Sequence, residues 1–430
     1  MLDTFLYILG ILIFLVGIAV SVGLHEVGHY LPAKKFGVEV RQFMVGFGPT
    51  LFSKMRGETE FGIKALPLGG YILMSGMYPP ATKPHRGLFA NWINEARAEI
   101  AAQEDTEESR KFYQLSAPKK ITIMLGGPVM NLLLGVVLIV VSLSGIGTLQ
   151  NSLKVDQVYQ CLEVDSAGLC EEGDPLTPAA LAGLQPGDEV VAVNGELVTS
   201  WAQVTSRLED KASSQLTVLR DGVEQTLTIE PIFMERAVYD AFGNLELDAQ
   251  GNPVTRLTPV LGIRLQGVTT PVALDQALLF AGTSMIAMAS FIVELPAQVY
   301  QVVASTLGFA ERDPFGAVSI VGVGQLAGEL TSADIGIDAK LASLLLLLGS
   351  LNLVLFVFNL VPLLPLDGGH VVGAVYEGAK RKIVKAVRGT DPGPIDTAKA
   401  LPLAYFVWVV LIVTGLLLIL ADLVNPITLG

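Results

Sequence analysis

The sequence predicts a polytopic α-helical membrane protein with a small soluble domain between its second and third spans. Of its 430 residues, 51% are hydrophobic and only 16% are charged, which is far more apolar than an ordinary soluble domain. Four segments are long and apolar enough to form transmembrane helices, because a hydrocarbon core takes about 20 helical residues to cross. They are Thr4 to Leu24, Ile121 to Val141, Leu341 to Val361, and Leu401 to Leu420.

Composition also excludes several functional classes. The formal net charge of −13 argues against a nucleic-acid partner, because phosphate binding needs a basic face. The high apolar content excludes an intrinsically disordered chain. Two cysteines in the whole chain exclude a disulfide-rich scaffold and a four-thiolate metal site. The chain has only four histidines, so their spacing is informative.

The first apolar segment has the features of a retained span rather than of a signal peptide. No basic residue precedes it, its apolar run is long, and no small-residue cleavage site follows it. We therefore expect it to remain in the protein as the first transmembrane helix.

The distribution of basic residues predicts the orientation, because loops left in the cytoplasm carry the excess of Lys and Arg. Residues 34 to 120 contain 13 Lys and Arg against 9 acidic residues, and residues 364 to 400 contain 6 against 4. Residues 146 to 340 contain 9 against 25. The middle segment is therefore expected outside, with both basic segments in the cytoplasm.

A fifth apolar segment, Ala277 to Val293, is marginal as a span because it is short and contains Gly, Thr and Ser. A fifth crossing would also place the basic residues at 380 to 388 outside. We expect an interfacial or core-packed helix here. The predicted organisation is an N-terminal membrane domain at 1–145, an outer domain at 150–268, a linker with an amphipathic or interfacial helix at 269–340, and a C-terminal membrane domain at 341–430.

The outer domain is predicted to be a small α+β fold. Residues 150 to 268 lack long apolar runs and contain short β-rich stretches such as Leu216 to Leu219. The segment Pro178 to Gly195 predicts a short helix, a Gly187-Asp188 turn, a buried strand and an Asn194-Gly195 hairpin turn. This segment resembles a PDZ domain of the bacterial protease-associated type.

The PDZ resemblance implies a peptide-binding groove. Its binding loop would be Leu261, Gly262 and Ile263, whose backbone amides would receive a peptide terminus or an added strand. The alternative is a β-domain that only packs against the membrane part. Cys161 and Cys170 both lie in this outer segment, where oxidising conditions permit a disulfide, and we expect the two cysteines to be bonded.

The sequence His25-Glu26-Val27-Gly28-His29 at the inner end of the first span carries the chemistry. On a helix, His25 and His29 are one turn apart and face the same way, so both can bind one zinc ion. Glu26 lies beside them and could take a proton from an attacking water. An ionisable residue inside a span costs at least about 2.5–3.5 kcal/mol unless it has a partner or water, and three lie here within five positions.

A catalytic zinc usually has three protein ligands, so one more is needed. Asp367 is the best candidate, because it lies at the inner end of the third span at a depth that matches His25. His370 and Glu377 are the second and third candidates. The alternative role of Asp367 is a turn or helix cap before two glycines.

These motifs together resemble the site-2 protease family of intramembrane zinc metalloproteases, in its bacterial regulator of sigma-E protease branch. The features that carry the resemblance are the His-Glu-x-x-His motif, the element Asn359 to Asp367, and the PDZ-like domain between the second and third spans. The single PDZ-like unit and the polar insert at 78–118 are more similar to actinobacterial members than to enterobacterial ones, which have two such units.

The resemblance implies one Zn²⁺ per chain and specific residue roles. The implied ligands are His25, His29 and Asp367, the implied base is Glu26, and the implied substrate contacts are Asn359 and Asn131. The implied partner is a membrane-spanning protein of the anti-sigma-factor type, cleaved in the lipid bilayer after its outer domain has been trimmed. The implied location is the bacterial inner membrane, with the active site near the cytoplasmic side.

The cytoplasmic stretch 59–73 alternates imperfectly between apolar and polar residues and predicts a membrane-associated β-hairpin with an exposed edge. A helical substrate must unwind before its carbonyls can be attacked, and strand addition at Ile63 and Ala65 would hold it extended. The alternative is a hairpin that only covers the site. His85 lies in a polar loop, and we expect no chemistry from it or from the charged helix predicted at Asn91 to Arg110.

Two other functional classes remain at this point. A membrane-anchored PDZ binding module would need the groove but not Glu26. A zinc transporter would need ionisable residues along a whole path, and the second and fourth spans contain none.

Overall fold

The computed structural model describes residues 2–79, 90, 91, 93, 94, 111–162, 170, 174–209, 212–238, 248, 253–310, 312, 313 and 316–427. His85 and most of the insert at 78–118 lie outside the described residues. The chain divides into two compact units. The first contains Met1–Gly145, Ala273–Asp334 and Lys340–Gly430, and the second contains Ile146–Val272 and Ile335–Ala339.

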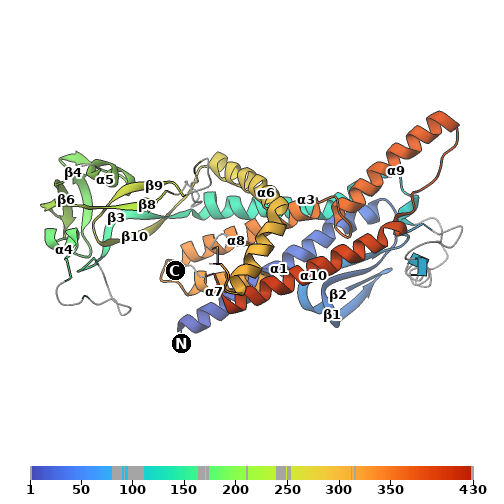
Figure 1. Ribbon diagram of the computed structural model, residues 1–430, viewed down its shortest axis with the longest axis horizontal. Coiled ribbons are helices and arrows are strands. Elements are labelled where there is room, and N and C mark those ends of the chain that lie inside the picture. Colours follow the sequence, from blue (N-terminus) through green and yellow to red (C-terminus); the bar gives the residue numbers. More distant parts are fainter. Residues whose placement is uncertain are drawn as a thin grey trace. The chain divides into compact units, whose positions relative to one another are not determined.

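The first unit is mainly helical (Figure 1). Its elements include the antiparallel pair β1 and β2 and a set of long helices. They are α1 (Leu2–Lys35), β1 (Val40–Arg56), β2 (Thr59–Met74), α3 (Ala117–Val140), α6 (Leu274–Thr306), α7 (Ile320–Ser332), α8 (Ile337–Asn359), α9 (Asp367–Arg388) and α10 (Leu401–Val424).

Five of the described helices are long and apolar enough to cross a membrane. Four overlap the predicted spans, namely α1, α3, α8 and α10. The fifth is α6, whose 33 residues extend well beyond the short apolar segment seen in the sequence. Length and composition alone do not decide whether α6 crosses the membrane, so four crossings with α6 as an interfacial or core-packed helix stays a prediction. The protein is a multi-pass membrane protein.

The segment 269–340, predicted as a linker with one amphipathic or interfacial helix, contains both α6 and α7. α7 packs against α1, where Ala327 is buried with Phe14 and Ile18. A Cβ on Gly10 would lie only 2.1 Å from Oγ1 of Thr331. Small residues therefore allow α7 to lie directly against α1, as in other membrane helix pairs.

Glycines also bring α1 and α3 into backbone contact. A Cβ on Gly28 would lie 2.2 Å from the carbonyl oxygen of Gly126, and a Cβ on Gly126 would lie 2.0 Å from the carbonyl oxygen of Gly28. Any larger residue would push the helices apart. Gly28 lies between the two histidines of the His-Glu-x-x-His motif, so this contact brings α3 to the histidines.

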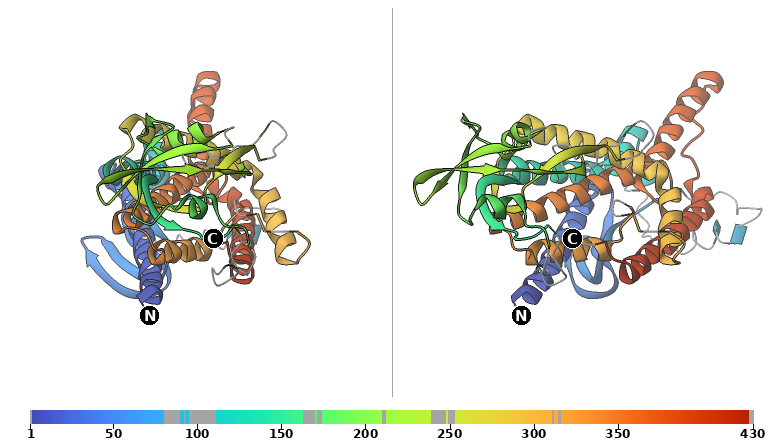
Figure 2. Two further views of the ribbon diagram at one scale, coloured as in Figure 1. Left: turned by 90° about the vertical axis from the view of Figure 1, so that its left-hand side faces the viewer. Right: turned by 60° about the vertical axis from the view of Figure 1, so that its left-hand side comes forward.

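The pair β1 and β2 forms a curved sheet beside α1 (Figure 2). Both strands bend and pair more than once: Gln42, for example, pairs with Leu73 and also with Glu60. Across the sheet, the segment 70–74 pairs with 40–45, 40–45 pairs with 59–64, and 59–64 pairs with 50–56. Within the described residues, 70–74 and 50–56 are therefore the two edges of the sheet.

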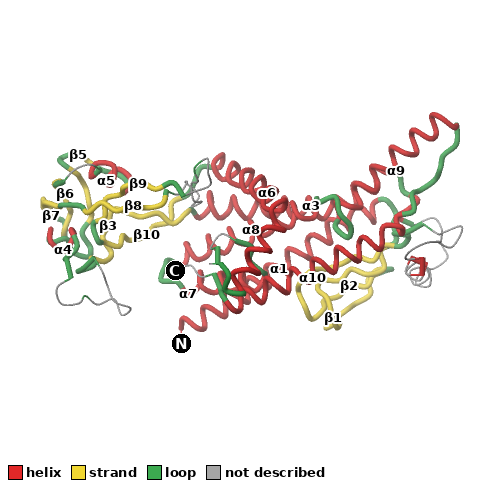
Figure 3. Tube along the Cα trace, viewed as in Figure 1, coloured by secondary structure: helices red, strands yellow, loops and turns green. Residues whose placement is uncertain are grey.

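The second unit has most of the remaining strands (Figure 3). Its main sheet has the order β10-β3-β4-β6-β7, with β5 paired to β4, and β8 and β9 form a separate ribbon. The bounds are β3 (Thr148–Val158), α4 (Pro178–Ala182), β4 (Glu189–Val193), β5 (Glu196–Leu197), α5 (Trp201–Leu208), β6 (Ser214–Arg220), β7 (Val223–Ile229), β8 (Ile232–Ala237), β9 (Thr255–Val260) and β10 (Ile263–Thr270).

The turns of this unit follow the sequence prediction. Asn194 and Gly195 both have positive φ, at 52° and 82°, which a two-residue hairpin turn requires. Asp188 follows the Gly187 turn and is buried. Burial acts to raise the pKa of Asp188, but hydrogen bonds from Arg220 and from the Gln185 N–H outweigh it and lower that pKa overall.

Candidate metal centre

Three metal-binding side chains meet in the first unit. α1 contributes His25 and His29, which lie one turn apart on the same face, and Asp367 is the first residue of α9. Nε2 of His25 lies 3.1 Å from Nε2 of His29. Oδ2 of Asp367 lies 3.4 Å from Nε2 of each histidine.

This triangle has the size of a zinc-binding face. Zinc binds nitrogen and carboxylate oxygen at about 2.0–2.2 Å in tetrahedral geometry, which places neighbouring ligand atoms about 3.3–3.6 Å apart. Oδ2 of Asp367 is buried and has no hydrogen-bond partner among the described residues. A buried carboxylate oxygen without a partner is costly, so the donor set fits a cation bound between these three side chains.

α3 orients both histidines. Nδ1 of His29 donates to the carbonyl oxygen of Ile123 at 2.8 Å, which leaves Nε2 available as a ligand. Nδ1 of His25 lies 3.1 Å from the side-chain amide of Asn131. The structure therefore places Asn131, predicted to contact substrate, directly against a histidine.

Gly127 makes this contact with α3 feasible. A Cβ on Gly127 would lie 2.2 Å from Nε2 of His29 and 2.7 Å from Nε2 of His25. Even an alanine would therefore occupy the space that the two imidazoles need. The glycine pair before Pro128 is thus required for the site as well as for helix packing.

Asp367 is positioned by a close contact between the end of α8 and the start of α9. A Cβ on Gly368 would lie 2.4 Å from the carbonyl oxygens of Leu360 and Val361. The two glycines after Asp367 let the chain fold back this tightly. Asn359, predicted to contact substrate, is the last residue of α8 and is half-buried just before this turn.

Glu26 is buried beside the metal-binding triangle, with 7% of its surface exposed. A Cβ on Gly70 of β2 would lie 3.0 Å from Cγ of Glu26. The edge segment 70–74 of the sheet therefore begins directly against the side chain predicted to be the catalytic base.

The two alternative candidates for the third ligand do not join the histidines. Within the described residues, the group of potential ligands consists of His25, His29 and Asp367. Glu377 instead pairs with Lys120. His370 lies one turn beyond Asp367 on α9 and is outside this group.

The predicted open edge is wrong at Ile63, whereas at Ala65 it stays a prediction. Ile63 pairs with Val45 on one side and with Phe52 on the other, so its segment lies inside the sheet, where its backbone groups are already paired. The prediction failed because it treated 59–73 as a self-contained hairpin. In the structure β1 is long enough to pair with both ends of β2.

The predicted outer residues lie in the second unit. Leu261, Gly262 and Ile263 line a cavity of about 400 Å³ together with Tyr159 and Trp201. Gly262 has a φ of +77°, and a Cβ there would lie 2.4 Å from Thr177. Cys161 and Cys170 are joined by a disulfide, with 5.8 Å between their Cα atoms.

Sequence reasoning missed two polar contacts near the site. Nδ2 of Asn352 on α8 donates to Oγ of Ser21 on α1, one turn before His25, at 2.9 Å. Asn352 is fully buried. The other contact is the pair Lys120 and Glu377. For Asn352 and Lys120 the available signal was a polar residue within an apolar helix, but that signal does not identify the partner.

The chain is similar to known metalloproteases over nearly its whole length. Residues 13–389 match peptidase family M50. The zinc metalloprotease Rip1 of Mycobacterium tuberculosis is 31% identical, with 99% of each chain covered. Rip1 of Mycolicibacterium smegmatis is 30% identical, with 98% of each chain covered. The metalloprotease MmpA of Caulobacter vibrioides is 27% identical, with 89% of each chain covered.

Proposed function

Because this chain belongs to peptidase family M50, the site-2 proteases, we propose that it cleaves the transmembrane segment of an anti-sigma-factor-like protein. The protein is a zinc metalloprotease that acts on membrane proteins within the bilayer. The single observation that carries the assignment of residues is the meeting of His25, His29 and Asp367 in one triangle beside Glu26.

In this proposal, His25, His29 and Asp367 hold the zinc ion. When bound, zinc supplies a Lewis acid that polarises the peptide carbonyl and the attacking water. The carbonyl of Ile123 keeps Nδ1 of His29 protonated, so that Nε2 faces the metal. Oδ2 of Asp367, which is buried 3.4 Å from Nε2 of each histidine, completes the donor set.

Asn131 is proposed to set the tautomer of His25. Oδ1 of Asn131 is buried and has no hydrogen-bond partner among the described residues, while its amide group lies 3.1 Å from Nδ1 of His25. With the amide turned so that Oδ1 accepts from the Nδ1–H group, Nε2 of His25 is free to bind zinc. This role differs from the substrate contact expected from the sequence.

Glu26 acts as the general base and then as the general acid. Its carboxylate takes a proton from the water that attacks the scissile carbonyl carbon, and it passes that proton to the leaving nitrogen as the C–N bond breaks. Its position next to both histidines and its burial keep it at the reacting atoms. The amine and carboxylic acid products account for every atom of the water and the peptide bond.

The charge distribution supports an active site near the cytoplasmic side. The basic segment 34–120 follows the histidine motif directly, and the basic segment 364–400 contains Asp367. Lys34 and Lys35 lie at the end of α1, about 14 Å beyond His25 at helical rise. We place the second unit outside, where its cavity at Leu261 to Ile263 could hold an extended peptide end of a PDZ ligand.

A two-substrate cleavage assay tests this proposed function. A tagged single-span anti-sigma-type protein is co-expressed with the protease in bacterial cells, either with its folded outer domain or with that domain removed. We expect only the trimmed form to be cut, because a folded outer domain would be held away by the PDZ-like unit. The fragment should be released into the cytoplasm, with its new end in the cytoplasmic half of the span.

Equal cleavage of the two forms would overturn the role of the outer unit as a size filter. A fragment released outwards would overturn the proposed orientation. Cleavage outside the span, in a loop, would argue that the enzyme acts on exposed segments instead of on unwound helices.

We further propose that the edge segment 70–74 holds the substrate extended. This segment pairs on one side with residues 40–45, and its other side is unpaired within the described residues. It begins at Gly70, against Glu26, so a strand added to it would pass beside the metal centre. Such pairing uses backbone hydrogen bonds and needs no particular side chains.

Proline substitutions at Tyr71 and Ile72 test the edge segment. Successive N–H groups of a strand point alternately towards and away from its partner, so one of these two prolines removes an outward donor. We expect that variant to lose roughly tenfold in cleavage rate, the value of one well-placed hydrogen bond, with zinc still bound. Lys54→Pro, on the opposite edge, serves as the matched control. Unchanged cleavage in both Tyr71→Pro and Ile72→Pro would show that this edge does not hold the substrate.

A further inference from the structure

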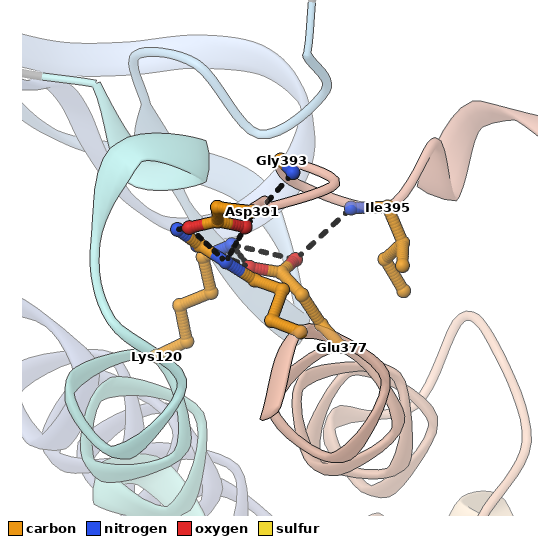
Figure 4. Close-up of polar contacts among 6 residues, drawn as sticks. Lys120, Glu377, Asp391, Gly393 and Ile395 are labelled. Carbon is orange, nitrogen blue, oxygen red and sulfur yellow. Dashed lines mark hydrogen bonds and ion pairs between the residues drawn. The ribbon is translucent and has the colours of Figure 1, made fainter. Parts of the chain in front are cut away.

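A buried ion pair joins α3 to α9 away from the metal centre (Figure 4). Nζ of Lys120 donates to both carboxylate oxygens of Glu377, at 2.8 and 2.9 Å. Lys120 is 4% exposed and Glu377 is 2% exposed. The catalytic chemistry uses neither residue, although each lies on a helix that contributes to the site.

The pair is part of a larger polar network. Oε2 of Glu377 also accepts from the Ile395 N–H at 3.3 Å, and Arg381 lies 3.5 Å from its other oxygen. Arg381 donates through Nε to Asp391 at 2.9 Å, and Asp391 accepts from the Gly393 N–H. The loop between α9 and α10 therefore closes over Glu377 (Figure 4).

The contact residues of α3 form a continuous stripe. On α3, residues 120, 123, 127 and 131 follow at three- or four-residue intervals, which places them on one face. This face contains Lys120 at one end and the histidine contacts at the other. On α9, Asp367 and Glu377 are ten residues apart, about 15 Å at helical rise, and Lys120 and Asn131 are separated by about 16 Å on α3.

α9 is therefore held at two points along its length, once against α3 and once against the histidines of α1. One point is the ion pair, and the other is Asp367 at the metal centre. Apolar side chains between them, such as Val371, which packs against the buried cluster that includes Ile123 and Met124, would still pack if α9 slid by a fraction of a turn. The buried charges of Lys120 and Glu377 do not tolerate such a shift. Each would lose its partner, and a buried charge without a partner costs several kcal/mol of stability.

We infer that Lys120 and Glu377 are positioning residues, whose buried contact fixes the register of α9 and so holds Asp367 against His25 and His29. The inference rests on the proposed function of those three residues as zinc ligands. It predicts that the affinity for zinc depends on a contact about 15 Å from the metal.

The first test compares the zinc affinity of two isosteric variants of the full-length protein. Glu377→Gln removes the charge of the pair, and we expect the dissociation constant for zinc to rise at least about tenfold, as when groups that orient metal ligands are lost. Asp422→Asn is the matched control, because Asp422 forms an equally buried ion pair with Arg312, and its hydrogen bonds among the described residues go to Arg312 and the Ser319 N–H. The measurement is zinc transfer to a colorimetric chelator. Equal loss of affinity in both variants would overturn the inference.

The second test separates positioning from stability. The double variant Lys120→Met with Glu377→Leu replaces the pair with apolar side chains, which often leaves stability unchanged or raised. We expect a melting temperature near that of the wild type together with weakened zinc binding, because an apolar contact does not specify the register. If zinc affinity returns to the wild-type value along with stability, the pair is merely structural and the inference fails.

Failure of the proposed metal site has a different signature. If the wild-type protein binds no zinc, or if Asp367→Ala binds it as tightly as the wild type, the assignment of the ligands is wrong. If the wild type binds zinc through Asp367 but Glu377→Gln binds it equally well, only the positioning role is wrong. The two ideas can therefore fail separately.

Discussion

Glu26→Gln is expected to abolish detectable cleavage while the zinc ion stays bound. The amide has almost the same shape as the carboxylate but cannot take a proton from the attacking water. General acid–base catalysis contributes about 10²–10⁴-fold to a rate, so we expect a loss of that size in kcat. The zinc content should not change, because the three ligand side chains remain. Cleavage of a tagged single-span substrate, with zinc measured in the same preparation, checks both expectations.

A control on the same helix makes this result specific. Asp3→Asn makes the same chemical change at the other end of α1, where Asp3 is exposed, and we expect it to cleave as the wild type does. Full activity of Glu26→Gln would show that another group acts as the base. Loss of zinc in Glu26→Gln would mean that Glu26 contributes to metal binding, and the proposal that Glu26 is the base and not a ligand would then be wrong.

Asp367→Ala is expected to lose zinc as well as activity. A catalytic zinc site with only two protein ligands left binds its metal weakly, since most such sites have three. His370→Ala is the matched control: it lies one turn further along α9 but outside the group formed by the histidines and Asp367. We expect His370→Ala to retain zinc at one ion per chain. Metal analysis of both purified variants checks this.

The reverse pattern would contradict the assignment. If Asp367→Ala keeps its zinc and His370→Ala loses it, then His370 is the third ligand, and α9 must shift along its axis by about 4.5 Å when zinc binds. If both variants keep zinc, the third ligand comes from elsewhere in the chain. Either outcome would also remove the basis for the positioning role of Lys120 and Glu377.

Much of the candidate site could be predicted because its pattern is local. His25, Glu26 and His29 share one helix, and a spacing of four residues places two side chains on the same face whatever surrounds them. No local pattern identifies Asp367, rather than His370 or Glu377, as the third ligand. The prediction of Asp367 depended on comparing the depths of two spans, and the structure brings Asp367 to the histidines through the contact of Gly368 with Leu360 and Val361.

The β-sheet beside α1 shows where a local pattern misleads. The residues 59–73 do form strands, as their alternation predicted. Their partners, however, come from β1, which pairs with β2 on both sides of the segment at Ile63. Strand pairing between distant residues depends on how the chain folds back, so alternation alone could not identify the edge. The edge next to Glu26 is at 70–74 instead.

The sequence by itself determined the apolar helices, the histidine pair with its glutamate, and the Asn194-Gly195 turn, because helical periodicity and turn geometry act over a few residues. Only the tertiary structure decided which helices pack against each other and at which residues they meet. The contacts of Gly28 with Gly126, and of Lys120 with Glu377 across 257 residues of sequence, arise from helix packing. A glycine or a charge in an apolar helix indicates a close contact or a partner, but only the packed fold specifies which residue supplies it.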